Sequence, residues 1–412
     1  MTQQFGKGHH LHLIDGSAFI FRAYHALPPL TRKSDGLPVG AVSGFVNMLQ
    51  RYIENNSGDD AATHVAVIFD KGSHTFRNDM YDQYKANRDA MPEDLRPQMP
   101  LTRDATRAFN IACEEIEGFE ADDIIATLSC QARNAGGRVT ILSSDKDMMQ
   151  LVGDGVEMLD PMKNKRIDRD AVVEKFGVQP ERVVDVQALA GDSVDNVPGA
   201  PGIGIKTAAL LINEYGDLET LLDRAGEIKQ PKRRESLLDN RAQIELSKRL
   251  VTLDCNMELP FDLDSLEIKD AVPEDLLAFL ALMEFRTIVK RIADKLGAKA
   301  PEIEAPAAVV ADAVPFDASK YETIRDAVAL QAWIDRIYAR GYVAVDTETT
   351  SLNEMRADLV GVSLCVEAGE AAYLPLTHRA GQSDDLFGTD ALAEGQMDLD
   401  TALAMLKPML ED

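Results

Sequence analysis

Acidic residues recur at short spacings beside apolar segments in the first half of the chain. The spacings are Glu-x-Asp-Asp, Asp-x-Asp and Asp-x-x-Asp. If the fold gathers these side chains in a site of low dielectric, their carboxylates repel one another strongly, and divalent cations would relieve that repulsion. The acids concerned are Asp15, Asp70, Glu120, Asp122, Asp123, Asp145, Asp147, Asp192 and Asp195.

The chemistry of this acidic set indicates which ions it binds. Hard oxygen ligands without His or Cys favour Mg²⁺ or Mn²⁺ over zinc, and the number of acids indicates two ions. Two such ions about 3.5–4 Å apart hold the attacking water and the leaving oxygen of an in-line phosphoryl displacement. The set therefore predicts metal-assisted hydrolysis of phosphodiesters.

Single pairs within the set have a second interpretation. Asp122 and Asp123 stand just before two isoleucines, where acids commonly cap the first turn of a helix. Asp145 and Asp147 alone are compatible with a cap at the end of a strand. Capping explains the whole set poorly, because it gives no reason for so many acids at the ends of several strands.

Two basic elements could contact a nucleic-acid substrate near these acids. The first pairs a cation with aromatic residues just after the first apolar run. The second lies in a polar segment between residues 70 and 101, which we expect to be a mobile insertion above the sheet. Cations and an aromatic ring suit a single strand threaded past the metals, although a solvated loop has the same composition. The residues are Arg22 in the first element and Tyr84, Lys85 and Arg88 in the second.

A third element is a glycine-rich turn that opens directly into a helix. Gly202 and Gly204 are followed by Lys206 and Thr207. Free N–H groups at the start of a helix bind phosphate, and such contacts position a duplex without reading its sequence. We therefore expect this turn to hold a nucleic-acid backbone at some distance from the metals.

The elements that must carry these residues alternate between strands and helices. Near-continuous apolar strands separated by helices predict a parallel sheet covered on both faces. Ligands bind such sheets beyond the carboxyl ends of the strands, where Asp15, Asp70 and Asp145 would project. The expected strands are 11–14, 65–69, 139–142 and 156–159, and the expected helices are 40–52, 101–112 and 121–133.

The rest of the chain divides into three parts. Residues 180–296 have a wholly helical pattern, and the Ala/Pro-rich residues 297–318 predict a semi-extended linker. A second α/β unit follows. Its expected helices are 325–339 and about 399–406, and its expected strands are 342–345, 359–366 and 371–375.

Charge and composition exclude several classes of protein. The net charge of −26 argues against a surface that grips nucleic acid all over, although it allows local basic patches. The four cysteines are far apart, without a CxxC pair, so we expect reduced and mostly buried thiols. No apolar run is long enough for a signal peptide or a membrane span. We expect a cytoplasmic protein without a membrane partner.

Six segments identify a family resemblance over residues 8–295. FRAYHAL, YKANR, GFEADD, SSDKDMMQL, GDSVDNVPG and GIGIKTA occur in this order. Together they closely resemble the 5′-nuclease family, which includes flap endonucleases and the N-terminal part of bacterial DNA polymerase I. The resemblance implies a PIN-like α/β core with a helical arch at 1–180. It also implies an all-helical helix–three-turn–helix DNA-binding module at 181–296.

The resemblance also implies an activity and roles for particular residues. The implied activity is metal-dependent 5′–3′ exonuclease and flap endonuclease cleavage, which removes 5′ flaps and RNA primers during DNA replication and repair. The nine acids match the metal ligands. Arg22, Lys85 and Arg88 match phosphate-contacting positions, and we expect Tyr84 to belong to the same catalytic group. Gly202, Gly204 and Lys206 match a turn that binds duplex DNA and a monovalent ion such as K⁺, and we expect Thr207 to contact the DNA beside them.

A second resemblance begins after the linker. Asp346 and Glu348 look like the first motif of a 3′–5′ exonuclease domain with an RNase H-like fold, and strand alternation puts both carboxylates on one face. An incidental acid pair at the end of a strand has the same spacing. The later motifs of that domain and a polymerase active site do not follow within this sequence. We therefore expect 319–412 to be a truncated domain with an incomplete second metal site.

The same pattern is compatible with two other classes of function. A PIN-type ribonuclease acting on folded RNA has the same acids, but the helical module and the second α/β unit argue against it. A non-catalytic DNA-binding module would use the glycine-rich turn alone, but nine intact acids argue against that. The sequence therefore predicts a nuclease that uses Mg²⁺ or Mn²⁺ and acts as a monomer on 5′-flap, nicked or RNA-primed DNA.

Overall fold

The parallel sheet expected from the apolar runs is present in the first of two structural units. The computed structural model describes residues 4–58, 60–88, 90–301, 320–351, 356–367, 369–379 and 392–411. These residues form two units, Met1–Pro306 and Ala307–Asp412, which are described separately. Most of the expected linker, 302–318, lies outside the described residues.

The sheet of the first unit has the strand order β3-β2-β1-β4-β5-β6. Neighbouring strands from β3 to β5 pair in parallel, and β6 pairs antiparallel to β5 at the edge. The two short strands β3 and β6 were not expected, because they have few apolar residues. The strands are β1 (His10–Asp15), β2 (His64–Ile68), β3 (Ala112–Glu114), β4 (Arg138–Leu142), β5 (Val156–Asp160) and β6 (Lys165–Ile167).

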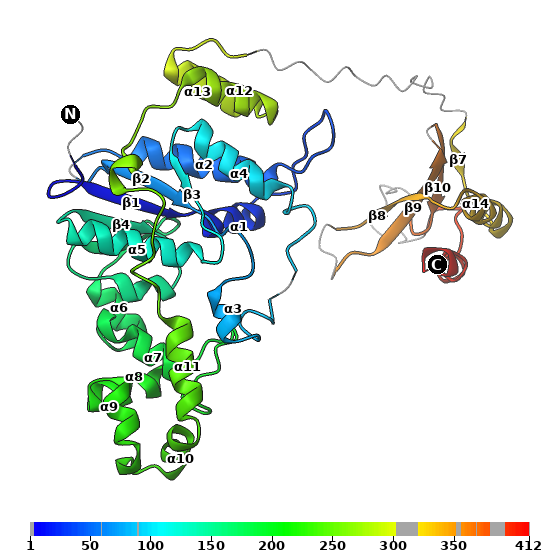
Figure 1. The fold of residues 1–412 in the computed structure, drawn as a ribbon. Helices are drawn as coiled ribbons and strands as arrows, with labels where there is room; N and C mark the ends of the chain where they lie inside the picture. The colour runs from blue at the N-terminus through cyan, green and yellow to red at the C-terminus, as the bar shows by residue number, and fades with distance from the viewer. Residues whose placement is uncertain are drawn as a thin grey trace, which may run out of the picture. The chain divides into compact units, whose positions relative to one another are not determined.

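Helices cover both faces of this sheet (Figure 1). Leu13 and Ile68 pack with α5 in one core, whereas Ile14 and Val67 pack with α1, α2 and α4 in the other. This alternation explains why the central strands carry apolar residues on both of their faces, since both faces are buried. The helices are α1 (Gly16–Ala26), α2 (Gly40–Asn55), α4 (Gln98–Ala108), α5 (Ala121–Asn134) and α6 (Arg169–Phe176).

The helical segment that follows contributes to two different cores. Helices α7 to α11 extend away from the sheet below α6, as Figure 1 shows. Helices α12 and α13 return to the sheet, where Leu280 and Ile292 pack in the same core as α2. The helices are α7 (Val183–Ala190), α8 (Ile205–Tyr215), α9 (Leu218–Asp223), α10 (Pro231–Asp239), α11 (Arg241–Val251), α12 (Pro273–Leu282) and α13 (Arg286–Leu296).

The polar segment between β2 and α4 differs from a continuous helical arch. Its one helix among the described residues is α3 (Phe76–Met80), and turns follow it. A long helix is interrupted here because Lys85 has a positive φ of 56° and because proline occupies positions 92 and 97. Tyr84 is buried, so this part of the segment is packed against the fold rather than solvated.

The second unit is a four-stranded sheet with two helices. The strand order is β7-β10-β9-β8, and Trp333 and Leu374 lie in its core. All six residues of the edge strand β8 are exposed. The elements are β7 (Glu322–Thr323), β8 (Ala344–Thr349), β9 (Leu359–Glu367), β10 (Glu370–Pro375), α14 (Ala327–Arg340) and α15 (Leu399–Leu410). Within the described ranges of both units, every helix is too short or too polar to cross a membrane.

Candidate active site

Asp15 and Asp70 lie at the carboxyl ends of the two adjacent strands β1 and β2. Asp15 ends β1 and caps α1, because its carboxylate accepts a hydrogen bond from the Ala18 N–H (2.9 Å). Its other oxygen accepts one from the Ser143 hydroxyl (2.9 Å), just after β4. Asp70 accepts hydrogen bonds from the Ser17 hydroxyl (2.6 Å) and from the N–H of Ala121 (2.9 Å) at the start of α5. These bonds hold four segments close together: the junction of β1 and α1, the residues after β2, the residues after β4, and the start of α5.

Asp122 and Asp145 complete a first acidic cluster with these two residues. Burial raises the pKa of Asp15 to about 7, and repulsion from Asp70 and Asp145 adds to the rise. Burial also raises the pKa of Asp122 well above its usual range, with Asp145 and Asp15 as the nearest charged causes. The fold therefore gathers four carboxyl groups that repel one another. We call Asp15, Asp70, Asp122 and Asp145 the first cluster.

A second acidic cluster lines a narrow cleft beside the first. Asp122 borders this cleft too, so the two clusters are contiguous. Burial raises the pKa of Asp147 to about 7, and repulsion from Asp145 adds to the rise. The other acids at this cleft accept hydrogen bonds from protein donors or pair with protein cations, which compensate part of their charge. The second cluster is Glu120, Asp147, Asp192 and Asp195.

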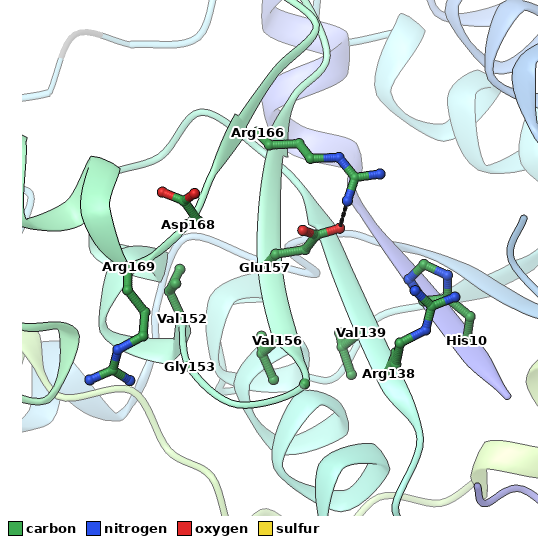
Figure 2. A pocket seen from close by; sticks show the side chains of 11 residues that line it. His10, Arg138, Val139, Val152, Gly153, Val156, Glu157, Arg166, Asp168 and Arg169 are labelled. Atoms are coloured by element: carbon green, nitrogen blue, oxygen red, sulfur yellow. Dashed lines mark hydrogen bonds and ion pairs between the residues drawn. The ribbon is translucent and has the colours of Figure 1, made fainter. Parts of the chain in front are cut away.

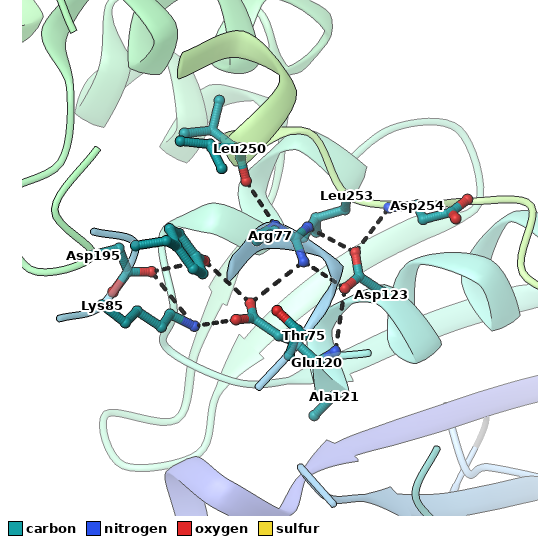
Figure 3. A network of polar contacts seen from close by, with 12 residues as sticks. Thr75, Arg77, Lys85, Glu120, Ala121, Asp123, Asp195, Leu250, Leu253 and Asp254 are labelled. Atoms are coloured by element: carbon teal, nitrogen blue, oxygen red, sulfur yellow. Dashed lines mark hydrogen bonds and ion pairs between the residues drawn. The ribbon is translucent and has the colours of Figure 1, made fainter. Parts of the chain in front are cut away.

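Lysine and arginine side chains neutralise most of the second cluster. Lys85 Nζ lies 2.7 Å from Glu120 Oε1 and 3.7 Å from Asp195 Oδ2 (Figure 3). Arg88 donates to Asp195 Oδ1 at 2.6 Å. The Tyr84 hydroxyl contacts both carboxylates, at 3.3 Å from Glu120 and 3.5 Å from Asp195. The polar segment thus brings the three basic and aromatic residues predicted from the sequence directly onto the acids.

Lys146 and Gln187 are contacts that the sequence reasoning missed. Lys146 Nζ lies 2.5 Å from Asp192 Oδ2, and the Gln187 amide donates to Asp147. Lys146 stands between Asp145 and Asp147, so its position was visible in the sequence, but its partner was not. Gln187 is on α7, and nothing in its sequence context points to the acids.

Asp123 differs from the expectation that it faces a metal. Both of its oxygens accept from the buried Arg77, with Nη1–Oδ2 at 2.6 Å and Nη2–Oδ1 at 2.8 Å (Figure 3). Asp123 also accepts from the N–H of Asp254 (3.0 Å). Its neighbour Asp122 points to the acids instead, because successive residues of a helix face different directions. The structure therefore gives Asp123 a role in holding α3 and the segment after α11 against α5.

A closed loop with glycine at both ends positions Asp192 and Asp195. The N–H of Asp192 donates to Val197 O (2.9 Å), and the N–H of Val197 donates back to Asp192 O (2.7 Å). Gly191 and Gly199 both have positive φ angles. A Cβ on Gly199 would lie 2.4 Å from Gly191 N. Only glycine allows the two ends of the loop to approach so closely.

The glycine-rich turn lies on the surface before α8. Gly202, Gly204 and Lys206 are exposed, and Thr207 is half-buried. Gly202 has a φ of 76°, and Gly204 is the N-cap residue just before α8. No neighbouring atom lies within 4 Å of a Cβ built on either glycine. The turn therefore presents open backbone at a helix start, as the sequence predicted.

Arg22 lies on α1 at a cavity with several lysines. The cavity lies beside the carboxyl ends of β4 and β5 and has a volume of about 680 Å³. Sequence reasoning identified Arg22 but missed the lysines, which are scattered around the β5–β6 hairpin and α6. The lysines are Lys163, Lys165 and Lys175.

The opposite edge of the sheet holds a different pocket (Figure 2). Its volume is about 240 Å³, and it lies at the amino ends of β1, β4 and β5. Arg166 and Glu157 form an ion pair there at 2.5 Å. None of the nine predicted acids lines it.

The donor set fits a hard divalent cation, although the carboxylates are not yet arranged around one. No three His, Cys, Asp or Glu side chains in the described ranges are arranged to hold a single ion. Three of the acids with raised pKa values, Asp15, Asp122 and Asp147, have no protein cation within ion-pairing distance in the described structure. Uncompensated, partly buried carboxyl groups of this kind are a fit for Mg²⁺ or Mn²⁺.

Asp346 and Glu348 lie on β8 of the second unit. Their partners in the antiparallel pairing with β9 are Ser363 and Gly361. Both acids are exposed. The Tyr373 ring lies over Gly361, because a Cβ there would meet the Tyr373 hydroxyl at 2.1 Å. The structure therefore places the two acids on one strand at solvent.

Comparison with protein families identifies the class of this chain. A model described as "5'-3' exonuclease, N-terminal resolvase-like domain" matches residues 10–177, and one described as "5'-3' exonuclease, C-terminal SAM fold" matches 178–274. A "3'-5' exonuclease" model matches 321–412. A 5′–3′ exonuclease of Aquifex aeolicus is 35% identical over 69% of this chain and 96% of its own length. The chain belongs to the 5′–3′ exonuclease family.

Within this family the chain is similar to the first part of DNA polymerase I. The DNA polymerase I of Rhizobium leguminosarum is 48% identical over 98% of this chain and 47% of its own length. That of Pseudomonas aeruginosa is 40% identical over 97% of this chain and 42% of its own length. The chain thus spans less than half the length of these two relatives.

A solved structure supports the fold. The T5 5′-exonuclease with bound zinc superimposes with a TM-score of 0.51 and 23% identity, over 59% of this chain and 89% of its own. The predicted family, and an α/β fold with a parallel-sheet core, are confirmed.

Proposed function

We propose that this chain cleaves phosphodiesters near the 5′ ends of branched or nicked DNA, including 5′ flaps and RNA primers, with two divalent cations. Membership of the 5′–3′ exonuclease family supports the direction of cleavage. The observation that carries the proposal is the first cluster, in which the buried Asp15 and the half-buried Asp122 repel each other and their acidic neighbours without a cation of the described residues in ion-pairing distance. Such an arrangement is unfavourable unless cations occupy it.

The two clusters would hold the two ions. Asp15, Asp70, Asp122 and Asp145 would hold the first, and Asp147, Asp192, Asp195 and Glu120 would hold or orient the second. Asp123 is not part of this set, because Arg77 occupies both of its oxygens. The oxygen-only donors favour Mg²⁺ or Mn²⁺. The bound ions would supply an activated water and stabilise the departing oxygen.

The basic residues at the clusters would position the scissile phosphate. Lys85 and Arg88 are bound to Glu120 and Asp195 in this structure, and each has donors free to turn to a phosphate. Cations aimed at the charge that develops in the transition state contribute rate rather than affinity alone. Arg22 and Tyr84 would contact the strand on either side.

The glycine-rich turn would hold the duplex part of the substrate. The open backbone at Gly202 and Gly204 and the exposed Lys206 suit a phosphate at a helix start. Thr207 would contact the same strand, and the turn of Gly202 and Gly204 would hold a monovalent cation such as K⁺, which would supply positive charge for the phosphate. Because these contacts reach only the backbone, binding would not depend on sequence.

A labelled 5′-flap duplex tests the proposal. We expect cleavage near the branch point in Mg²⁺ or Mn²⁺, loss of cleavage in EDTA, and loss of at least 100-fold in rate for Asp145→Asn. Asp145 is exposed, so this variant should fold. Asp104→Asn, an exposed acid of α4 in a surface ion pair, is the matched control and should cleave normally.

The same experiment separates the nuclease from a DNA-binding module. Full-length chain that binds the flap but leaves it intact in both metals would refute catalysis and favour the module. Cleavage of folded RNA in preference to flap DNA would instead favour a ribonuclease.

A further inference from the structure

Helix α5 and the segment after α11 are held side by side by hydrogen bonds. The Thr127 hydroxyl donates to Asp254 O (2.8 Å) and accepts from the N–H of Met257 (3.3 Å). One turn earlier, Asp123 accepts from the N–H of Asp254 (3.0 Å). Residues 254–257 therefore run along one face of α5.

This contact brings two cysteines together. Cys255 stands between the two residues that bind Thr127, and Cys130 lies three positions after Thr127, on the same face of α5. The hydrogen bonds of Thr127 hold Cys255 against the face of α5 that carries Cys130, and each thiol shifts the pKa of the other. Both residues are half-buried, and both are free thiols in this structure. The sequence did not show this pair, because more than a hundred residues separate its members.

We propose that Cys130 and Cys255 form a reversible disulfide when the protein meets a small-molecule disulfide oxidant such as oxidised glutathione. The thiolate of one cysteine attacks the oxidant, which forms a mixed disulfide and releases one reduced thiol. The second thiolate then attacks the mixed disulfide, which closes the protein bridge and releases the second thiol. The protein loses two electrons and two protons, and the oxidant gains them.

Two observations favour Cys130 as the first nucleophile. The hydrogen bond from the Cys255 thiol lowers the pKa of Cys130 to about 7, and thiolates rather than thiols attack disulfides. The Arg133 guanidinium lies 3.9 Å from Cys130 Sγ, where its positive charge stabilises a thiolate. Cys113, by contrast, has a pKa that burial raises to about 11.

The bridge would stabilise the fold with little effect on the reacting groups. It would tie residues 254–257 to α5, which begins just after Glu120 and carries Asp122 in its first turn. Cys130 is eight residues after Asp122, or about 12 Å along the helix, so the acids should keep their positions. A disulfide that closes a loop of more than about 100 residues restricts the unfolded chain strongly. We expect the melting temperature to rise by roughly 5 °C or more.

Mass spectrometry of the full chain tests the bridge without any variant. The protein is incubated with oxidised glutathione, its remaining free thiols are blocked, and it is digested with trypsin without reduction. A Cys130–Cys255 bridge joins peptide 108–133 to peptide 250–269. Because 108–133 also contains Cys113, fragmentation must place the link at Cys130. Dithiothreitol should separate the peptides and lower the melting temperature again.

Matched serine variants complete the experiment. Cys130→Ser and Cys255→Ser should each abolish the linked peptide and the oxidant-induced rise in melting temperature. Cys113→Ser and Cys365→Ser should keep both. A link that uses Cys113, or a link between two copies of the chain, would overturn the proposal. So would an oxidant that modifies Cys130 but leaves it as a mixed disulfide, without a bridge to Cys255.

Discussion

Arg77 and Asp123 form a bidentate ion pair that is almost wholly removed from solvent. Their side chains are 1% and 0% exposed. The remaining donors of Arg77 bind Leu250 O (2.7 Å) and Thr252 O (3.1 Å), at the end of α11. One guanidinium thus joins α3, α5 and the helical module (Figure 3). The pair explains why the two adjacent acids of the Glu-x-Asp-Asp motif have different roles.

Asp123→Asn should therefore destabilise the protein much more than Asp145→Asn. Removal of one partner leaves the other charge buried and unpaired, which costs about 3–5 kcal/mol. Asp145 is exposed at the acids, so its loss should change the free energy of unfolding little and abolish cleavage instead. Urea unfolding of the two variants, followed by flap cleavage under folding conditions, makes the comparison.

The double variant Arg77→Met/Asp123→Leu is the control for that prediction. Apolar replacements remove both buried charges, so most of the lost stability should return. If Asp123→Asn unfolds at the wild-type urea concentration and cleavage alone is lost, Asp123 is a metal ligand after all.

Lys85→Met should slow cleavage more than it weakens binding. Lys85 is the cation nearest to Glu120 and also faces Asp195, and loss of a cation that stabilises the transition state costs on the order of 100-fold in rate. Single-turnover rates at saturating enzyme, measured beside the Kd for the flap duplex, separate the two effects. Lys269→Ala is the matched control, because Ile268 beside it binds Thr63 at the amino edge of the sheet. An equal loss in both variants would argue against a role in the reaction.

Asp15 and Asp147 should each make a contribution to the stability of the metal-free protein that falls as pH rises from about 4 to 8, whereas the buried His10, His12 and His64, whose pKa values are lowered, act in the opposite direction. The pKa values of Asp15 and Asp147 are raised to about 7 in the folded protein. At these two carboxyl groups the folded state therefore binds more protons than the unfolded state between the ordinary aspartate pKa and 7, and their contribution to stability decreases with pH across this window. For Asp15, a rise of about 3 pKa units at about 1.36 kcal/mol per unit gives a loss on the order of 4 kcal/mol.

Metal should remove that pH dependence. Cations that bind only the folded state favour the ionised carboxylates and stabilise it by mass action. Urea titrations at pH 5 and pH 8, with EDTA and with Mg²⁺, give four midpoints. Asp15→Asn should lose less stability than wild type, or gain more, between the two pH values in EDTA. The same difference between the two pH values in wild type and in Asp15→Asn would contradict the burial of Asp15, because the buried histidines contribute equally to both proteins.

Gly199→Ala should disrupt the loop that carries Asp192 and Asp195. The added Cβ would lie 2.4 Å from Gly191 N, at a residue with a φ of 61°. Both the clash and the left-handed backbone oppose alanine, which costs about 1–3 kcal/mol or displaces the loop. We expect a lower melting temperature and reduced cleavage.

Gly226→Ala is the matched substitution for the loop variant. Its built Cβ has no neighbour within 4 Å, and its φ is not positive. Thermal unfolding of both variants should therefore show a shift only for Gly199→Ala. Similar shifts in the two variants would mean that loop closure at Gly199 is not tightly constrained.

The sequence predicted the parts of the site that depend on strand order and local spacing. Asp15, Asp70 and Asp145 follow apolar strands, and the carboxyl ends of parallel strands meet at one edge, so their proximity followed from the fold class. The glycine-rich turn before α8 was also visible, because glycine and a helix start are local features. The second unit was predicted element by element, apart from the two-residue strand β7.

Contacts between distant segments were not visible in the sequence. Nothing local distinguishes Asp122, which faces the acids, from Asp123, which binds Arg77. The same holds for the packing of Tyr84 against Glu120 and for Cys130 beside Cys255. These relationships depend on how α5, the polar segment and the end of α11 pack together.

The amino-acid sequence by itself determined the chemical class of this protein, because acids follow several parallel strands whose carboxyl ends meet at one edge, and so many carboxylates gathered there call for divalent cations. The tertiary structure alone decided which acids have no protein cation beside them and which are neutralised by Arg77, Lys85, Arg88 or Lys146. The physical reason is that a carboxylate's charge depends on its burial and on the cations within a few ångströms, and those neighbours come from segments far away along the chain.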